Sequence, residues 1–473
     1  MIKLYNSVTH TVDPFTTHEP GKVKMYTCGP TVYHFAHIGN LRSYIMEDVL
    51  EKFLRWSGYD VLRVMNITDV GHLASDADTG EDKMLKGARR EHKTVMEIAR
   101  FYTDAFFEDC KKLNIRKPDV VEPATGCIPE FIEMVEKLIA DGYAYLAGGN
   151  VYFDTSKCEE YYVFNRHNEE DLEVGVRDGV EADGNKKNKG DFVLWFTKSK
   201  FDDQELKWDS PWGIGYPGWH IECSAISIKH CGEYLDLHCG GIDNQFPHHT
   251  NEIAQSEAYL GHAWCPQWFH VHHLNTTGGK MSKSKGEFLT VSLLEQKGYD
   301  PLVYRFFCLQ SHYRKSLVFS FENLDNANTA YKKLIEKIAA LLPEKNGEVD
   351  AEVFAAYKEK FAAAMGEDLN TSMAVTAVYD VLKAKTNPAT KLALLADYDE
   401  VLSIGMIAAA EKLASAAPAE SDEDEAYITE MIAKRAAAKK AKNFAEADAI
   451  RDELKAKGIL LVDSSQGTTW KRA

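Results

Sequence analysis

The feature that most constrains the fold is a strand, a turn, a helix and a second strand that follow one another between residues 23 and 67. Residues 23–27 are apolar-rich and end at a turn that starts at Cys28. Residues 41–56 place apolar side chains at helical spacing, and residues 61–67 return to the pattern of a buried strand. This order predicts a βαβ unit and hence a parallel sheet, whose ligands bind beyond the carboxyl ends of the strands.

The helix of this unit has candidate boundary residues, and the rest of the chain predicts how the sheet is embedded. We expect Asn40 to cap the helix and Gly58 to follow its end. The fold class is α/β: a Rossmann-like parallel sheet interrupted by a connective insertion, then a helical bundle and a small C-terminal α+β module. The expected bounds are 1–117 and 208–275 for the Rossmann-like domain, 118–207 for the insertion, 276–320 for a loop region, 321–410 for the bundle, 411–424 for a linker and 425–473 for the module.

Charge and cysteine content narrow the class of protein. The 473 residues carry a formal net charge of -17, which argues against a general affinity for nucleic acid. Residues 425–473 instead hold ten Lys/Arg against seven Asp/Glu, so any RNA contact is expected at a local basic surface. Nine cysteines without a CxxC pair do not predict a disulfide framework. No apolar run is long enough for a membrane span, so we expect a water-soluble, cytoplasmic protein.

Two short motifs indicate a nucleotide site. The sequence HIGN at residues 37–40 lies between the first strand and its helix, where unpaired backbone N–H groups bind phosphate. His37 can add a hydrogen bond, and Gly39 leaves room for a nucleotide. The sequence KMSKS at residues 280–284 places two ammonium groups on a glycine-led loop, which suits the charge of a transferring phosphate. Either motif alone is also explained by an ordinary turn or a solvated basic loop.

Four residues form a candidate metal site, namely Cys28, Cys223, His248 and Glu252. His248 and Glu252 are four apart, so they share one face if the segment is a helix. Two thiolates, an imidazole and a carboxylate are a plausible zinc shell. Because the cysteines are far apart in the sequence, they are also compatible with buried, inert thiols.

Taken together, the motifs resemble a class I aminoacyl-tRNA synthetase, and the resemblance to the cysteinyl-tRNA synthetase family extends along the whole chain. It rests on the HIGN and KMSKS motifs in this order on the two halves of an interrupted sheet. Five further stretches support it: YTCGPTVY at 26–33, NITD at 66–69, DFVLW at 191–195, GWHIEC at 218–223 and QGTTW at 466–470.

The resemblance implies ATP-dependent activation of L-cysteine to cysteinyl-adenylate and transfer to the 3′-terminal ribose of tRNA(Cys). One Zn²⁺ per chain on the four residues named above would select the substrate thiolate, and ATP would enter with Mg²⁺. The implied catalytic residues are His37, Lys280 and Lys283, and the implied ATP-binding residues are His37, Gly39, Asn40, Asp243 and Lys283. Thr68 and Trp219 would bind cysteine, although a strand-end cap and a core tryptophan are alternative roles.

The same resemblance assigns roles to the domains. Residues 1–117 and 208–275 would be catalytic, 276–320 would hold the KMSKS loop and contact the tRNA stem, and 425–473 would bind the anticodon. A monomer is expected. Three residues depart from the family pattern: Asn40 replaces the second His of HIGH, Thr250 replaces a Glu, and Cys239 interrupts a Gly triplet. Asn40 can still donate a hydrogen bond to ATP.

Two alternative functions share most of these motifs. A cysteine ligase with an amino-sugar acceptor would keep the zinc and ATP residues but lack the C-terminal module, which this chain has. A non-catalytic zinc-containing RNA-binding protein would not need Lys280 and Lys283.

Overall fold

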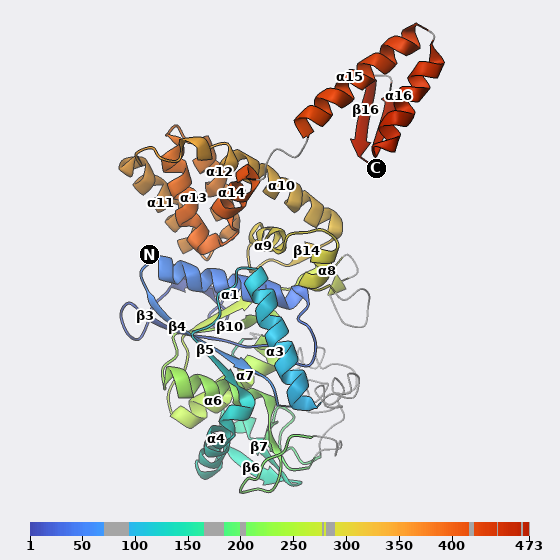
Figure 1. Ribbon diagram of the computed structural model, residues 1–473. Helices are drawn as coiled ribbons and strands as arrows, with labels where there is room; N and C mark the ends of the chain where they lie inside the picture. The colour runs from blue at the N-terminus through green and yellow to red at the C-terminus, as the bar shows by residue number, and fades with distance from the viewer. Residues whose placement is uncertain are drawn as a thin grey trace. The chain divides into compact units, whose positions relative to one another are not determined.

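The fold is described from a computed structural model, drawn in Figure 1, which describes residues 1–70, 94–164, 184–198, 205–276, 279–280, 289–415, 421–441, 443–464 and 467–472. The chain divides into two compact units, Met1–Ile407 and Ala408–Ala473. Within the described residues, no helix combines the length and apolar character needed to cross a membrane.

A five-stranded parallel sheet forms the centre of the first unit. Its strands lie in the order β11 (Gln267–Val271), β10 (Leu237–Gly241), β3 (Lys22–Thr27), β4 (Asp60–Ile67) and β5 (Val120–Pro123). All neighbouring pairs are parallel. Helix α1 (Ile38–Trp56) connects β3 to β4 and packs against β4 and β10. The predicted βαβ unit and the α/β fold class are therefore confirmed.

Helix α1 begins earlier than predicted. Its N-cap is His37, whose Nδ1 accepts a hydrogen bond from the backbone N–H of Asn40 at 3.1 Å. The prediction of Asn40 as N-cap is wrong, because the imidazole nitrogen takes the acceptor role that Asn, Asp, Ser or Thr usually has. Gly58, with φ of 94°, follows the end of the helix as predicted. The shift brings residues 38–40 of the motif into the first turn of the helix.

A second, antiparallel sheet lies between the halves of the first. Its strands are β6 (Ala144–Ala147), β7 (Asn150–Phe153), β8 (Phe192–Phe196) and β9 (Tyr216–Pro217), and helix α4 (Ile128–Ala140) precedes them. The strand pairing places β5 in the parallel sheet and β9 in this one, so the two sheets do not divide at residues 118 and 207.

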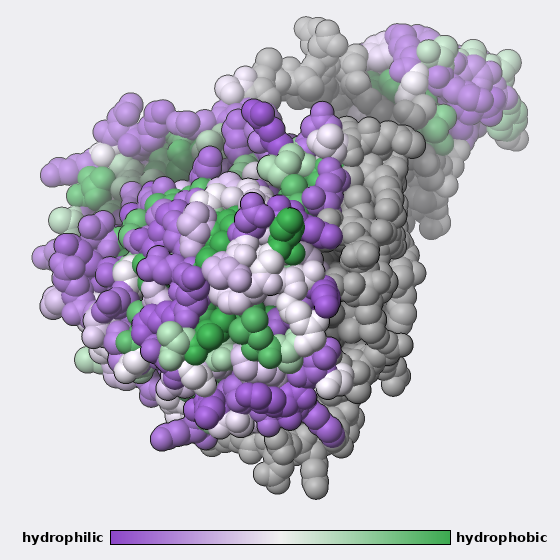
Figure 2. Space-filling view, turned by 90° about the horizontal axis from the view of Figure 1, so that it is seen from below, coloured by the Kyte–Doolittle hydropathy of each residue, from purple (hydrophilic) through white to green (hydrophobic). Residues whose placement is uncertain are grey.

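The face in Figure 2 carries hydrophobic side chains in small groups among hydrophilic ones.

Helices form most of the remainder of the first unit. They are α3 (Val95–Lys112), α6 (Trp219–Cys231), α7 (Thr250–Leu260), α8 (Val291–Gln296), α9 (Pro301–Leu309), α10 (Phe321–Ala339), α11 (Ala351–Gly366), α12 (Thr371–Lys383) and α13 (Pro388–Leu402). Helices α11, α12 and α13 pack on one another (Figure 1). Three small strands, β12 (Leu274–Thr276), β13 (Gly279–Lys280) and β14 (Leu317–Phe319), form another sheet, and β1 (Lys3–Asn6) pairs with β2 (Thr11–Pro14).

A buried arginine joins the helices to α1. Arg305 of α9 donates to Asp48 Oδ2 at 2.6 Å, to the Leu402 carbonyl at 2.7 Å and to the Leu113 carbonyl at 3.0 Å. Its side chain and that of Asp48 are fully buried. Since a buried charge is costly unless it is paired and hydrogen-bonded, these contacts fix the ends of α3 and α13 beside α1.

The second unit has its own small core. Helix α14 (Met406–Ser415) leads into it, and α15 (Ser421–Lys440), α16 (Phe444–Ala456), β15 (Ile459–Ser464) and β16 (Gly467–Arg472) follow. Ile450 and Leu454 of α16 are buried, and Trp470 packs against this cluster. The sequence also places Phe444 at helical spacing from Ile450 and Leu454, but Phe444 is the first residue of α16 and is 62% exposed. Parts of the predicted linker, residues 411–415 and 421–424, are helical.

Candidate active site

A cavity of about 350 Å³ opens at the carboxyl ends of four strands of the parallel sheet. Residues shortly after each strand line it: Cys28 after β3, Thr68 after β4, Asp243 after β10 and His272 after β11. The strands are parallel neighbours, so their ends meet at one edge of the sheet. The sequence motifs around these residues, though up to 244 positions apart, therefore face a single cavity.

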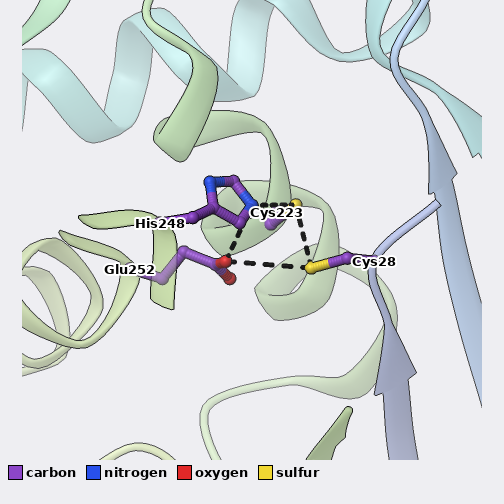
Figure 3. A group of neighbouring side chains, drawn as sticks. All are labelled: Cys28, Cys223, His248 and Glu252. Atoms are coloured by element: carbon purple, nitrogen blue, oxygen red, sulfur yellow. Dashed lines mark hydrogen bonds and ion pairs between the residues drawn. The ribbon is translucent and has the colours of Figure 1, made fainter. Parts of the chain in front are cut away.

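The four candidate metal ligands come together, as Figure 3 shows, and three of them, Cys28, Cys223 and His248, line this cavity. Their donor atoms all lie within 4.8 Å of one another. The two sulfurs of Cys28 and Cys223 are 3.8 Å apart, and His248 Nε2 lies 3.5 Å from the Cys223 sulfur. Glu252 Oε1 lies 3.1 Å from His248 Nε2 and 3.9 Å from the Cys28 sulfur. Strand β3 and helices α6 and α7, with the turn before α7, supply these residues.

These separations fit a tetrahedral ion of zinc's size. Zinc–sulfur bonds of about 2.3 Å at tetrahedral angles place two sulfurs ~3.8 Å apart, and a zinc–nitrogen bond of about 2.0 Å places nitrogen and sulfur ~3.5 Å apart. The sulfur pair and the Cys223–His248 pair have these distances. Two thiols, an imidazole and a carboxylate are also the donor types that zinc takes in proteins. The residues present therefore fit a zinc ion.

Because the cluster is buried, ionised acidic groups in it are unfavourable unless a cation is bound beside them. Glu252 is fully buried, and desolvation raises its pKa from 4.5 to about 8. Burial likewise raises the pKa of the Cys28 and Cys223 thiols. Ionised acids in such a site need a compensating positive charge. A bound divalent cation would supply that charge, so electrostatics and distances favour the same occupant.

A set of histidines that the sequence reasoning missed surrounds the cluster. His220 Nδ1 lies 2.8 Å from His248 Nδ1, which leaves His248 Nε2 toward the sulfurs. His238 Nε2 lies 2.8 Å from Glu252 Oε2. His249 Nε2 is 3.3 Å from the Cys28 sulfur, and its Nδ1 is 2.7 Å from His270 Nε2. Groups that hold metal ligands in this way fix their orientation.

Some of these histidines also form a second possible donor set. Cys28, His238, His249 and Glu252 lie within the same 4.8 Å limit and share two residues with the first set. Burial lowers the pKa of His238 to about 3 and that of His249 well below its usual value, so both imidazoles are neutral. The signal in the sequence was available: His238 and His270 interrupt apolar strands, where an unpartnered histidine would be costly.

The two residues predicted to bind cysteine line the same cavity as the cluster. Thr68 Oγ1 donates to Glu222 Oε2 at 2.8 Å and accepts from Asn66 Nδ2 at 3.1 Å, so its hydroxyl is held in one orientation. The Trp219 ring stacks on His248 with centroids 4.5 Å apart. Both residues line the cavity. Each is therefore placed to contact a ligand that reaches the cluster.

Four of the residues predicted to bind ATP form a second group of cavity-lining residues, the nucleotide side. His37, Gly39, Asn40 and Asp243 all line the cavity. A Cβ on Gly39 would lie 2.9 Å from His37 Nδ1, so a side chain there would displace the imidazole that caps α1. Lys280 belongs to β13, while Lys283 lies outside the described residues.

The departures from the family pattern have simple surroundings. Thr250 Oγ1 donates to the Gln245 carbonyl at 2.7 Å, so this side chain ties down the turn before α7. Cys239 is fully buried in β10, and burial raises its pKa well above the usual value. Neither residue lines the cavity. Asn40 is exposed in the first turn of α1.

Comparisons with known proteins agree with this arrangement. A family model described as the tRNA synthetases class I (C) catalytic domain matches residues 14–329. The Cysteine--tRNA ligase of Treponema denticola is 46% identical over 496 residues, which cover 100% of this chain and 99% of that protein. The Cysteine--tRNA ligase of Borrelia turicatae is 42% identical over 488 residues, with 100% of both chains covered.

Solved structures share the fold at much lower identity. Mycobacterium tuberculosis methionyl-tRNA synthetase in complex with methionyl-adenylate is 14% identical with a TM-score of 0.51, covering 82% of this chain and 90% of that chain. A LeuRS from Agrobacterium radiobacter in a ternary complex with tRNA and LeuAMS is 12% identical with a TM-score of 0.57, covering 86% of each chain. At such identities the likeness concerns the fold alone.

The parallel sheet, the crevice at its carboxyl edge and the matching family model define the catalytic domain of a class I tRNA synthetase. The chain is 46% and 42% identical, along its whole length, to two Cysteine--tRNA ligases, and this identity indicates the family within that class. The chain belongs to the cysteine--tRNA ligase family.

Proposed function

We propose that the chain uses ATP to convert L-cysteine to cysteinyl-adenylate and then transfers cysteine to the 3′-terminal ribose of tRNA(Cys). The observation that carries the proposal is the cluster of Cys28, Cys223, His248 and Glu252, of which the first three line the same cavity as the N-terminus of α1. A site of soft donors beside a phosphate-binding helix end suits a substrate that has a sulfur at one end and reacts with a nucleotide at the other.

The sulfur-binding side would choose the amino acid. A Zn²⁺ ion on the four ligands would bind the substrate sulfur as a thiolate, whereas a serine hydroxyl is a much poorer ligand at neutral pH. Trp219 and Thr68 would bound the space that the rest of the amino acid occupies. Because Glu222 and Asn66 hold the Thr68 hydroxyl, its oxygen would face the substrate without reorganising.

The nucleotide side would bind ATP together with Mg²⁺. The N-terminus of α1, which carries the positive end of the helix dipole, would face the phosphates, with His37, Gly39 and Asn40 shaping the approach. Asp243 would accept hydrogen bonds from the ribose. Lys280 and Lys283 would balance the charge that develops as the cysteine carboxylate attacks the α-phosphorus and pyrophosphate leaves. Positioning and charge stabilisation would provide most of the rate increase.

The remaining regions would serve tRNA. We propose residues 1–117 and 208–275, together with the edge strand β5, as the catalytic domain. The rest of 118–207, together with β9, would be the connective insertion, and 276–320 the KMSKS-loop and stem-contact region. The bundle at 321–410 and the module at 425–473, joined by 411–424, would dock tRNA, the module at the anticodon. The module contains ten Lys/Arg and seven Asp/Glu, and this excess of positive charge favours RNA contact there. The enzyme would act as a cytoplasmic monomer.

Cysteine-dependent exchange between ATP and pyrophosphate tests the first step, and charging of total tRNA tests the second. We expect exchange with cysteine, little with serine at the same concentration, and cysteinyl-tRNA as the product. Exchange without tRNA charging, together with transfer to an amino sugar, would point to the alternative ligase. Absence of cysteine-dependent exchange in the metal-loaded protein would contradict the proposal.

A further inference from the structure

His273 contacts Asp243, and no sequence motif indicated this contact. We propose that His273 is a positioning residue of the nucleotide site, which holds the Asp243 carboxylate in the orientation that binds the ribose of ATP. The inference rests on the proposed function, in which Asp243 is the ribose contact. His273 would act through Asp243 and so set how strongly the enzyme prefers a ribonucleotide to a deoxyribonucleotide.

The two side chains meet because of strand register. Gly241 of β10 lies opposite Val271 of β11 in the parallel pair. Asp243 and His273 each follow two residues later, and both line the cavity. His273 Nε2 lies 3.3 Å from Asp243 Oδ1. Because an ionised carboxylate only accepts hydrogen bonds, a His273 ring whose Nε2 carries a proton can donate to Asp243 from this position.

The backbone of His273 is held by a buried arginine. Arg42 of α1 is fully buried, and its Nη1 donates to the carbonyls of His272 at 2.5 Å and of His273 at 2.7 Å. Its Nη2 donates to the Lys315 carbonyl at 2.7 Å. Hydrogen bonds from a charged donor are stronger than neutral ones. The contacts therefore connect α1, which carries His37 and Gly39, to the segment that carries His273.

Such support matters because the His273–Asp243 pair is half-exposed. The side chains are 32% and 49% exposed, and pairs of this kind contribute little when both partners are free to move. With its backbone fixed, His273 loses less freedom on pairing, so the contact can bias the carboxylate. A carboxylate has about four acceptor positions. Asp243 can thus accept from His273 and from a ribose hydroxyl at the same time.

Equilibrium binding of three nucleotides tests the proposal without cysteine or tRNA. ATP, 2′-deoxy-ATP and 3′-deoxy-ATP are titrated into the full-length wild type, His273→Ala, Asp243→Ala and the double variant. We expect His273→Ala to weaken ATP binding by about threefold to tenfold and the deoxy nucleotide that lacks the contacted hydroxyl by less. The preference for ATP should therefore fall, and the double variant should match Asp243→Ala alone.

Two further variants separate positioning from general damage. His273→Gln keeps an N–H donor and should restore part of the preference for ATP. His262→Ala is the matched control, because His262 also lies near a carboxylate, Glu233 at 3.9 Å, with a side chain 28% exposed, but does not line the cavity. It should leave the preference unchanged.

The proposal is overturned if His273→Ala keeps the wild-type preference for ATP, or if its effect and that of Asp243→Ala multiply in the double variant. It is also overturned if the wild type binds all three nucleotides equally, since Asp243 would then not contact the ribose. A wild type that prefers ATP but lacks cysteine-dependent exchange would contradict the proposed reaction and leave the His273 result valid.

Discussion

The two sides of the cavity are built differently. On the sulfur side, Glu252 is fully buried and in contact with His238 and His248. On the nucleotide side, the Asp243 side chain is 49% exposed and Asn40 is exposed. The first side resembles a protein core in its packing, and the second resembles a surface.

This difference in burial indicates which side of the cavity is expected to discriminate more strongly between ligands. Buried polar groups whose partners are fixed lose little freedom when a ligand binds, and they discriminate strongly because a wrong ligand leaves them unpaired. Half-exposed groups gain less from each contact. We therefore expect the sulfur side to decide which amino acid reacts, and the nucleotide side to contribute smaller terms that add up across several residues.

The largest effect is expected for Cys223→Ser. The change should remove the metal and lower cysteine-dependent exchange by more than about 100-fold, because a hydroxyl replaces a thiolate ligand. Metal analysis and the exchange rate are the measurements. Cys231→Ser is the control, since Cys231 is a buried cysteine on the same helix outside the cluster. Full activity in a metal-free Cys223→Ser protein would contradict the larger role expected for the sulfur side.

A pH effect on stability should appear when the metal is chelated. Burial raises the pKa of Glu252 from 4.5 to about 8, so the folded metal-free protein holds this proton more tightly than the unfolded chain. Stability from this group is then full below pH 4.5 and is lost as pH rises toward 8. We expect a loss of about 4–5 kcal/mol across that range, since one unit of pKa shift corresponds to about 1.4 kcal/mol.

Urea unfolding of the chelated protein at pH 6 and pH 8 measures the part of this loss that falls between those two pH values. Glu252→Gln carries no titrating carboxyl and should be less dependent on pH over the same interval. Equal pH dependence in the wild type and this variant would show that another group is responsible.

An intermediate effect is expected for His220→Ala. His220 contacts the metal ligand His248 through Nδ1 and is not itself a ligand in the proposed set. Removing it should lower metal affinity by about 10–100-fold, the range seen when a group that orients a ligand is lost. Competition with a chromophoric chelator gives the affinity. An affinity equal to that of the wild type would mean that the histidines around the cluster do not orient it.

The smallest effect is expected on the nucleotide side. Asp243→Ala should raise the KM for ATP by about tenfold, the loss of one hydrogen bond to a charged group, with a smaller change in the KM for cysteine. Initial rates of exchange at varied ATP and cysteine give both constants. A larger rise in the KM for cysteine than in the KM for ATP would contradict the assignment of Asp243 to the nucleotide side.

Periodicity and turn residues predicted the parallel sheet and α1, since both depend on local patterns. The resemblance to a family identified the four cluster residues, which spacing alone left undecided. His220, His238, His249 and His270 were not predicted, because their partners are set by packing between α6, β10, α7 and β11 rather than by neighbours in sequence. The contact of His273 with Asp243 likewise depends on the register of two strands and on Arg42 of α1.

The central claim is that substrate sulfur binds at the metal held by the cluster. Absorption spectra of the protein with Co²⁺ in place of the native ion, before and after addition of cysteine or serine, test it most directly. We predict Co²⁺–thiolate charge-transfer bands from Cys28 and Cys223 that increase on addition of cysteine and do not change with serine. A spectrum that cysteine leaves unchanged, or that serine changes equally, would contradict the claim.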